Sequence, residues 1–287
     1  MPFNPELWFT EKYTDNCGFT FKVKEVLHTE YSNLQRLDIL DTYEFGKIML
    51  LDGFIMYTER DEFVYHEMIT HLPLFAHENP KSVLIIGGGD GGSAREVSRH
   101  AYLERIDDVE IDEIVPINSM KYTPFVGDGF KQDNVNLIIG DGIDYVKNKN
   151  GSYDVVIVDS TDPFGPAEGL FNSEFYSNVK NILRDGGIVV AQAENAYYDA
   201  KWMMRSVNNM RRAFGNDKVT IYQAAIPTYP SGCWAFSIAW KGDKHPMESF
   251  DKERFEKLNL KLKYYNPAIH KAAFVLPNYV SEILNNN

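Results

Sequence analysis

The sequence predicts an α/β protein with a doubly wound parallel sheet, preceded by a small antiparallel β domain. Three observations support this fold class. The chain has 287 residues, 44% hydrophobic and 24% charged, which is the size and composition of one large or two modest globular domains. From Phe19 to Thr58, short runs of residues alternate between apolar and polar side chains. After Lys81, short Val- and Ile-rich runs are separated by helical patterns.

The alternation near the N-terminus indicates half-buried strands joined by tight turns. Ser32-Asn33, Gly46 and Asp52-Gly53 provide turn residues between the runs. We therefore expect an antiparallel β-meander domain over residues 1–60, followed by a second domain over 61–287. The expected strands are Phe19–Leu27, Leu34–Leu40, Ile48–Leu51 and Phe54–Tyr57.

The pattern changes to helical spacing at Asp61. This residue can cap a helix, and acidic residues follow it in the first turn, where the helix dipole favours them. The sequence predicts a helix from Asp61 to Leu72 that ends near Pro73.

The remaining chain alternates strand-like and helix-like segments. The first five apolar runs are separated by helical stretches, which is typical of parallel strands covered on both faces. Ligands of such sheets bind at the carboxyl ends of the strands. The expected strands are Val83–Ile86, Ile106–Ile111, Val135–Ile139, Val155–Val158, Ile188–Ala191, Val219–Ile226 and Ala235–Trp240.

Charge and cysteine content narrow the function classes. Twenty-nine basic against 41 acidic residues give a formal net charge of −12, so we expect neither nucleic acid nor a membrane surface as partner. The two cysteines, Cys17 and Cys233, form no C-x-x-C motif. No leader-like segment and no apolar run of the ~20 residues that span a bilayer is present, so the sequence predicts a cytoplasmic protein.

A glycine-rich loop, Gly87–Gly92, follows the first strand of the expected parallel sheet. Glycine lets a ligand approach the main chain closely, and a helical pattern follows the loop. Glu110 ends the next strand, about 20 residues on, where an acidic side chain accepts ribose hydroxyls in nucleotide sites. A plain turn and a solvated strand-end carboxylate are the alternatives. No Gly-Lys-Ser/Thr follows, so the loop is not a P-loop.

Further carboxylates end the third and fourth strands. Asp141, beside Gly142, can accept from the exocyclic amine of adenine, or it can simply cap the next helix. Asp159 follows four apolar strand residues, where a carboxylate is costly to bury without a cation. Asp162 can serve the same crevice or only form the turn before Pro163.

These carboxylates predict a cationic nucleoside as ligand. Phosphates of NAD or ATP would be repelled, whereas the sulfonium of an S-adenosylmethionine-like molecule would be attracted. Asp90, inside the glycine loop, would repel the carboxylate of a methionine moiety and accept a bare amine. A decarboxylated sulfonium fits best.

In order along the chain, many motifs resemble those of the spermidine synthase family of aminopropyltransferases. The resemblance covers nearly the whole chain and implies a methyltransferase-like Rossmann domain after the β domain. It also implies transfer of aminopropyl from decarboxylated S-adenosylmethionine to putrescine, releasing methylthioadenosine. The motifs begin at Leu51, Thr58, Tyr65, Gly87, Val109, Gly140, Asp159, Ile226, Tyr264 and His270.

The resemblance also implies roles for individual residues. Asp159 and Tyr65 would be catalytic, with Asp159 orienting the attacking amine or taking its proton. The implied nucleoside-binding residues are Gln35, Gly87, Asp90, Glu110, Asp141, Gly142 and Pro166. The implied putrescine-binding residues are Trp8, His66, Asp90, Asp159, Asp162, Gln192 and Tyr229. For Tyr65 and Trp8, core packing is the alternative, and the loop from Ser160 to Phe171 would close over bound ligands.

No resident cofactor and no metal are expected. His66 and His71 are five apart, whereas the zinc-helix motif needs four. The decarboxylated nucleoside would be a co-substrate. The alternatives are a diamine N-methyltransferase that uses intact S-adenosylmethionine and a non-catalytic nucleoside or polyamine sensor. Length differences among amine acceptors are worth only about 1–3 kcal/mol, so the acceptor stays open. The resemblance further implies a homodimer or homotetramer.

Overall fold

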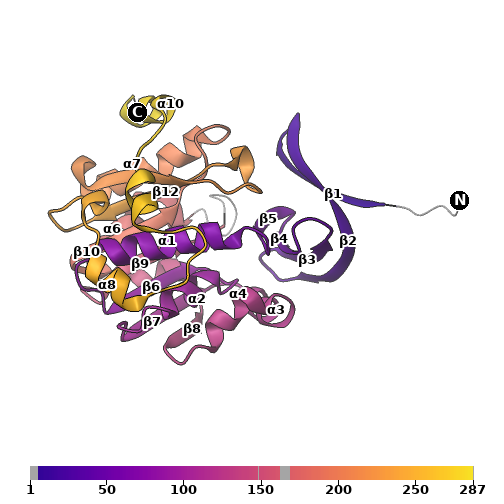
Figure 1. The fold of residues 1–287 in the computed structure, drawn as a ribbon, viewed down its shortest axis with the longest axis horizontal. Coiled ribbons are helices and arrows are strands. Elements are labelled where there is room, and N and C mark those ends of the chain that lie inside the picture. Colours follow the sequence, from indigo (N-terminus) through magenta and orange to yellow (C-terminus); the bar gives the residue numbers. More distant parts are fainter. Residues whose placement is uncertain (1–5, 148, 162–168, 287) are drawn as a thin grey trace, which may run out of the picture.

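The computed structural model describes residues 6–147, 149–161 and 169–286. Two sheets make up the molecule, a five-stranded antiparallel sheet and a seven-stranded mixed sheet. Figure 1 shows the N-terminal sheet, in indigo, standing beside the larger α/β layer structure. No helix within the described residues is long and apolar enough to cross a bilayer.

The N-terminal sheet is the expected meander, with one strand more than the sequence pattern indicated. Its strands pair in chain order: β1 (Leu7–Thr14), β2 (Cys17–Tyr31), β3 (Arg36–Thr42), β4 (Lys47–Leu51) and β5 (Phe54–Thr58). The strand β1 was not predicted because its apolar residues Leu7, Trp8 and Phe9 are contiguous and mostly exposed, so no alternation marks it.

The larger sheet confirms the predicted doubly wound fold. Its strand order is β11-β12-β10-β9-β6-β7-β8. The first five of these strands along the chain are parallel, and β12 is antiparallel to both neighbours. The strands are β6 (Ser82–Gly87), β7 (Arg105–Glu110), β8 (Val135–Ile139), β9 (Tyr153–Asp159), β10 (Leu183–Gln192), β11 (Val219–Ala224) and β12 (Trp234–Trp240).

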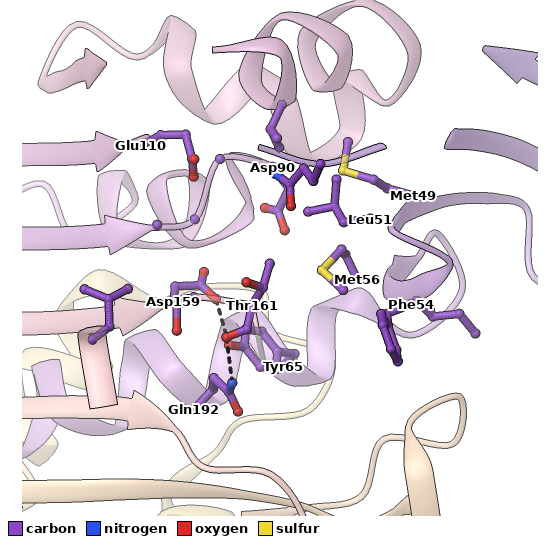
Figure 2. Close-up of a pocket in the computed structure, with 18 of the residues that line it drawn as sticks. Met49, Leu51, Phe54, Met56, Tyr65, Asp90, Glu110, Asp159, Thr161 and Gln192 are labelled. Carbon is purple, nitrogen blue, oxygen red and sulfur yellow. Dashed lines mark hydrogen bonds between the residues drawn. The ribbon is translucent and has the colours of Figure 1, made fainter. Parts of the chain in front are cut away.

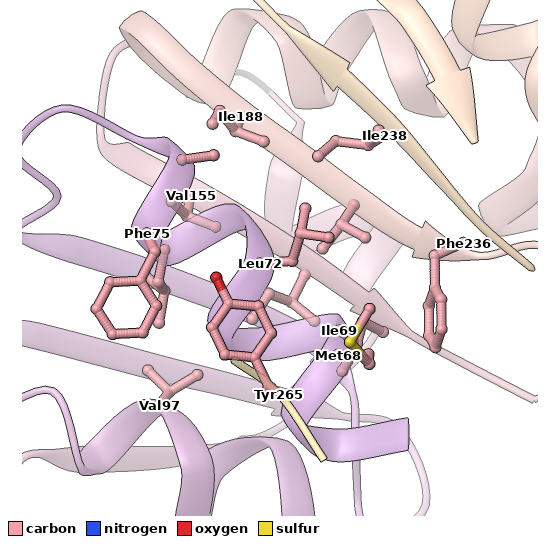
Figure 3. Close-up of a cluster of buried hydrophobic side chains, with 14 of the residues drawn as sticks. Met68, Ile69, Leu72, Phe75, Val97, Val155, Ile188, Phe236, Ile238 and Tyr265 are labelled. Carbon is pink, nitrogen blue, oxygen red and sulfur yellow. The ribbon is translucent and has the colours of Figure 1, made fainter. Parts of the chain in front are cut away.

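Helices cover both faces of this sheet. On one face, Ile69, Leu72 and Phe75 of α1 pack with strand residues such as Val155 and Ile188 (Figure 3). The opposite face is buried mainly by α6 and α7, whose apolar side chains join a second core cluster. The helices are α1 (Glu62–Ala76), α2 (Gly92–Ser98), α3 (Ile114–Tyr122), α4 (Pro124–Gly127), α5 (Gly142–Val146), α6 (Ser173–Ile182), α7 (Ala200–Phe214), α8 (Lys252–Leu258), α9 (Pro267–Ala272) and α10 (Asn278–Asn285).

The prediction that the first helix ends near Pro73 was wrong, because α1 continues through this proline to Ala76. A proline removes one intrahelical hydrogen bond. Here the last turn is buried in the core, with Leu74 and Phe75 fully inaccessible to solvent. The Tyr222 hydroxyl also donates to the Met68 carbonyl, one turn earlier (2.9 Å). Packing therefore outweighs the local preference of the proline.

Candidate functional site

A pocket lies where the N-terminal sheet meets the carboxyl edge of the parallel strands (Figure 2). The N-terminal sheet supplies an apolar wall, and the large sheet supplies carboxyl groups. The pocket therefore lies where ligands usually bind in a doubly wound fold, at the carboxyl ends of the parallel strands. Residues labelled in the view are Met49, Leu51, Phe54, Met56, Tyr65, Asp90, Glu110, Asp159, Thr161 and Gln192.

The glycine loop lines this pocket with bare main chain. Gly87 has φ of +81°, and a Cβ there would lie 2.2 Å from the carbonyl oxygen of Asp159. A Cβ on Gly89 would lie 2.6 Å from Oε2 of Glu110. The Gly88 N–H donates to the Asp159 carbonyl (2.6 Å). Only glycine fits these positions, because a backbone carbonyl and a carboxylate approach them so closely.

Two of the predicted nucleoside-binding residues, Gln35 and Glu110, lie at one end of the pocket. Glu110 accepts the Asp112 N–H at Oε1 (2.8 Å). Burial raises the pKa of Glu110 to about 7; the Asp112 carboxylate adds to the rise, while hydrogen bonds from backbone N–H groups, that of Asp112 first, oppose it. Gln35, from the turn between β2 and β3, donates to Oδ2 of Asp112 (3.0 Å). The turn of one domain is thereby tied to the strand end of the other.

Asp141 and Gly142 border the same end. The Asp141 carboxylate accepts the Ile143 N–H (2.7 Å) and caps α5, so the capping interpretation is confirmed. The cap occupies one carboxylate oxygen in the described structure. Recognition of adenine by Asp141 stays a prediction.

Asp159 lies at the centre of the pocket, held by two hydroxyl donors. Tyr65 donates to Oδ1 (2.7 Å), and Ser93 of α2 donates to Oδ2 (2.6 Å). Burial raises the pKa of Asp159, and the Asp90 carboxylate adds to the rise, while His66 and the two hydroxyls oppose it. Burial also raises the pKa of Tyr65 well above its usual value. Tyr65 therefore remains a protonated donor, and Asp159 is the proton-accepting group of the pair.

The structure places His66 behind Asp90 and not on the pocket wall. Its side chain is buried, with Nδ1 2.6 Å from Oε2 of Glu62 and Nε2 3.4 Å from Oδ2 of Asp90. Burial alone would lower the pKa of His66, but Asp90 and Glu62 outweigh it and raise this pKa to about 10. The imidazole is therefore a buried cation beneath Asp90. This placement does not provide the expected direct contact of His66 with a diamine, because the ring projects from α1 toward the glycine loop.

Gln192 and Tyr229 border the other end of the pocket, as expected for acceptor-binding residues. Gln192 donates to the Thr161 carbonyl (3.2 Å) and accepts the Glu194 N–H (3.1 Å). The Tyr229 ring lies 5.9 Å from the Tyr65 ring and 4.9 Å from the Trp234 ring. This end therefore combines aromatic faces with polar groups, a surface suited to an alkyl chain with amine ends.

Of the three other expected residues, Trp8 does not line the pocket. Trp8 is 53% exposed and borders a separate hollow on the N-terminal sheet. Its strand carries it about 10 Å from Glu11, the nearest β1 residue that borders the pocket. Asp162 and Pro166 lie outside the described residues.

Other residues of the site were not anticipated. Ser93, which donates to Asp159 without itself lining the pocket, was overlooked because it lies inside the helix after the glycine loop, not at a strand end. Glu194 follows a predicted strand by three residues, so it could have been predicted from the tendency of ligands to bind at the carboxyl ends of strands. Glu11 and Lys12 lie on β1, the strand without a sequence signal. Asp199, at the start of α7, also lines the pocket.

One buried carboxyl group lies just beneath the pocket. Asp108 is on β7, two residues before Glu110, and is wholly inaccessible to solvent. Within the described residues, neither of its carboxyl oxygens has a hydrogen-bond partner. Oδ2 of Asp108 lies 3.6 Å from the Cβ position of Gly88, and Oδ2 of Asp159 lies 3.3 Å from the same point. Burial raises the pKa of Asp108 well above its usual value, and Glu110, Asp159 and Asp90 add to the rise.

The strand order, the glycine loop and the carboxylate-lined pocket together define a methyltransferase-like nucleoside-dependent transferase. Residues 62–252 match the family model described as the spermine/spermidine synthase domain, and residues 7–59 match that of the spermidine synthase tetramerisation domain. The chain therefore belongs to the spermine/spermidine synthase family, and it is an enzyme, an aminopropyltransferase.

Individual relatives agree over nearly the full length. A polyamine aminopropyltransferase of Clostridium botulinum (strain Eklund 17B / Type B) is 48% identical over 284 residues, 98% of this chain and 99% of the relative. The polyamine aminopropyltransferase of Clostridioides difficile (strain 630) is 48% identical over 282 residues, 97% of this chain and 99% of the relative.

Solved structures show the same agreement. A crystal structure of spermidine synthase in complex with the transition state analogue AdoDATO has a TM-score of 0.94 and 40% identity, covering 98% of this chain and 96% of the other. Spermidine synthase from Thermotoga maritima has a TM-score of 0.92 and 39% identity, covering 98% and 95%. These likenesses do not favour a methyltransferase or a non-catalytic sensor.

Proposed function

We propose that this aminopropyltransferase transfers the aminopropyl group of decarboxylated S-adenosylmethionine to putrescine, giving spermidine and 5'-methylthioadenosine. One observation carries the proposal. Asp90, Glu110 and Asp159 converge on the pocket from the ends of three neighbouring strands of the sheet, β6, β7 and β9, as Figure 2 shows. Such a site attracts a sulfonium and an amine, and it repels phosphate.

Asp90 supports the decarboxylated form of the donor. Its Oδ1 accepts the Gly92 N–H (2.6 Å), which fixes the carboxylate in the loop that lines the pocket. A methionine carboxylate in this place would face a like charge, whereas a bare propylamine would face a counter-ion. The buried imidazolium of His66 holds Asp90 from behind and leaves its pocket side available to the ligand.

Putrescine would be activated by Asp159. An alkylamine has a pKa near 10.4, so on the order of one molecule in 10³ is neutral at pH 7. With Tyr65 and Ser93 donating to it, Asp159 is held in a fixed direction to orient the amine. The amine nitrogen attacks the carbon next to sulfur, the carbon–sulfur bond breaks, and its electron pair leaves with the neutral thioether. The product nitrogen is then a secondary ammonium, which gives one proton to Asp159 or to water and becomes the secondary amine. Proximity and orientation are the largest contributions to rate.

The far amine of the diamine would remain charged and bind near the β1 end of the pocket. Glu11 and Glu194 are both buried there, and Asp199 lines the same end. Burial raises the pKa of Asp199, so a bound ammonium would favour its charged form. The three acidic groups support an acceptor with a positive end.

The proposal includes further expectations of the resemblance. Asp162 and Pro166 belong to the segment that would close over the ligands. The protein would need no resident cofactor or metal, since the nucleoside is consumed as a co-substrate. We place it in the cytoplasm, and we infer a homo-oligomer, dimer or tetramer, formed through residues 7–59, the segment matched by the tetramerisation model.

Mass spectrometry of the products tests the proposal. The purified protein is incubated with putrescine and, in parallel, with decarboxylated or intact S-adenosylmethionine. Spermidine and methylthioadenosine from the decarboxylated donor alone are expected. N-methylputrescine from the intact donor would show a methyltransferase, and nucleoside binding without product would show a sensor.

Asp159→Asn separates chemistry from binding. We expect its kcat to fall by on the order of 10²–10⁴, the usual range for a lost general base. Methylthioadenosine affinity should stay close to that of the unmodified enzyme. Near-normal turnover by this variant would remove Asp159 from the mechanism.

A further inference from the structure

Lys12 contrasts with every other charged group of the pocket. Among the described residues that line the pocket, Lys12 is the single Lys or Arg side chain, against several carboxylates. It is exposed, and its ammonium has no ion pair or hydrogen bond within the described part of the chain. An exposed lysine that borders a site built for cations requires an explanation, because its charge opposes the attraction that the carboxylates provide.

Contacts of β1 place Lys12 at the acceptor end of the pocket. The Tyr13 ring lies 5.8 Å from the Tyr198 ring, and Cys17 Sγ lies 3.4 Å from the Tyr198 hydroxyl. These contacts hold the β1–β2 hairpin against the segment after β10, which carries Glu194 and Asp199. The nucleoside-binding residues Gln35 and Glu110 border the pocket from other elements. Lys12 therefore lies beyond the reacting centre, on the acceptor side.

We propose that Lys12 is a specificity-determining residue that disfavours amine acceptors longer than a diamine. The inference rests on the proposed function. When one amine of a diamine attacks, one ammonium remains, and Glu11, Glu194 and Asp199 surround the space for it. A triamine bound in the same way carries a further ammonium outward, to the mouth where Lys12 lies. Two like charges then meet, and the triamine is rejected.

The size of the effect follows from the exposure of Lys12. Two unit charges about 4 Å apart in water repel with an energy equal to roughly a fivefold change in an equilibrium constant. Partial exclusion of water by the pocket walls increases this factor. Salt screens charges at an exposed mouth, so the discrimination should weaken as ionic strength rises.

Lys12→Gln tests the inference, with Lys24→Gln as the matched control. Lys24 is an exposed lysine on β2 that does not line the pocket. The kcat/KM for putrescine and for spermidine is measured with the decarboxylated donor, and spermine is detected as the product of the second acceptor. We expect the spermidine-to-putrescine ratio to rise at least fivefold in Lys12→Gln and to stay constant in Lys24→Gln.

A third acceptor separates charge from length. N-Butyl-1,4-diaminobutane matches spermidine in length but ends in a methyl group and not in an ammonium. If Lys12 acts by charge, the substitution raises the relative use of spermidine, most at low salt, and leaves that of the butyl analogue constant. An unchanged spermidine ratio, or an equal rise for both long acceptors, would overturn the inference. Failure of the unmodified enzyme to use putrescine would instead overturn the proposed function.

Discussion

Asp108 should make the folded protein less stable as the pH rises. The carboxyl group is wholly buried, has no hydrogen-bond partner within the described residues, and has a pKa raised well above 3.8. Between the unfolded and the folded pKa, the unfolded chain has released this proton and the folded chain keeps it. Stability that is complete below the unfolded pKa is therefore lost progressively as the pH rises toward the folded pKa.

The substitution Asp108→Asn removes this dependence, because an amide of the same shape has no proton to release. Each pH unit in that interval costs the unmodified protein about 1.4 kcal/mol relative to the variant. In a protein of this size this corresponds to roughly 3 °C in Tm per pH unit. Thermal unfolding of both proteins at pH 5, 6, 7 and 8 measures the difference. We expect the Tm of the variant to rise relative to that of the unmodified protein with increasing pH, up to the folded pKa of Asp108.

Asp107, the neighbouring residue on β7, is a control with the opposite sign. Burial would raise its pKa, but hydrogen bonds from Tyr153, Asn136 and Arg105 lower it. Its stabilising contribution is present above the unfolded pKa and is lost only at lower pH. Asp107→Asn should therefore show a constant deficit from pH 5 to 8. A constant difference for Asp108→Asn over the same range would refute the assignment of a protonated Asp108.

Three further outcomes follow from the pocket. Glu110, with a pKa of about 7, must be ionised to accept both ribose hydroxyls, so the affinity for methylthioadenosine, measured by calorimetry, should fall about tenfold from pH 8 to pH 6. Glu110→Gln should abolish this pH dependence, and a pH dependence that survives would contradict ribose binding by Glu110. Tyr65→Phe removes a hydrogen-bond donor to the Asp159 carboxylate and should lower kcat/KM for the diamine about 10–10²-fold in steady-state kinetics. An unchanged kcat/KM would show that Tyr65 serves only in packing. His66→Ala leaves Asp90 without its buried cation, while Glu62 keeps Arg95, and the substitution should cost about 3 kcal/mol in urea unfolding. An unshifted midpoint would show that the imidazole carries no charge.

The sequence pattern predicted the architecture well because two periodicities carry it. Alternation marks the strands from Phe19 onward, and buried Val and Ile runs mark the parallel strands. The failures are of another kind. The strand β1 is an edge strand with mostly exposed side chains, so burial imposes no alternation on it. Pro73 was read as a helix end, although the core holds its helix through the following turn.

The lining of the pocket was predictable where it is formed by strand ends. Glu110, Asp141 and Asp159 follow strands, and the fold brings them to one edge. Residues that act through tertiary contacts are not marked by a position at the end of a predicted strand. The buried imidazolium of His66 depends on Asp90 and Glu62, and the hydroxyl of Ser93 reaches Asp159 only when α2 packs beside β9.

The backbone contact between the glycine loop and Asp159 separates two properties of the enzyme. The Gly88 N–H and the Asp159 carbonyl join the glycine loop directly to the end of β9, so the relative position of Asp90 and Asp159 is set within the large sheet. The acceptor end, by contrast, is closed by a hairpin of that other sheet, through Glu11 and Lys12. Substitutions in the hairpin can therefore change which amine is accepted without disturbing the chemistry. Acceptor range and catalytic power can evolve on separate parts of the chain.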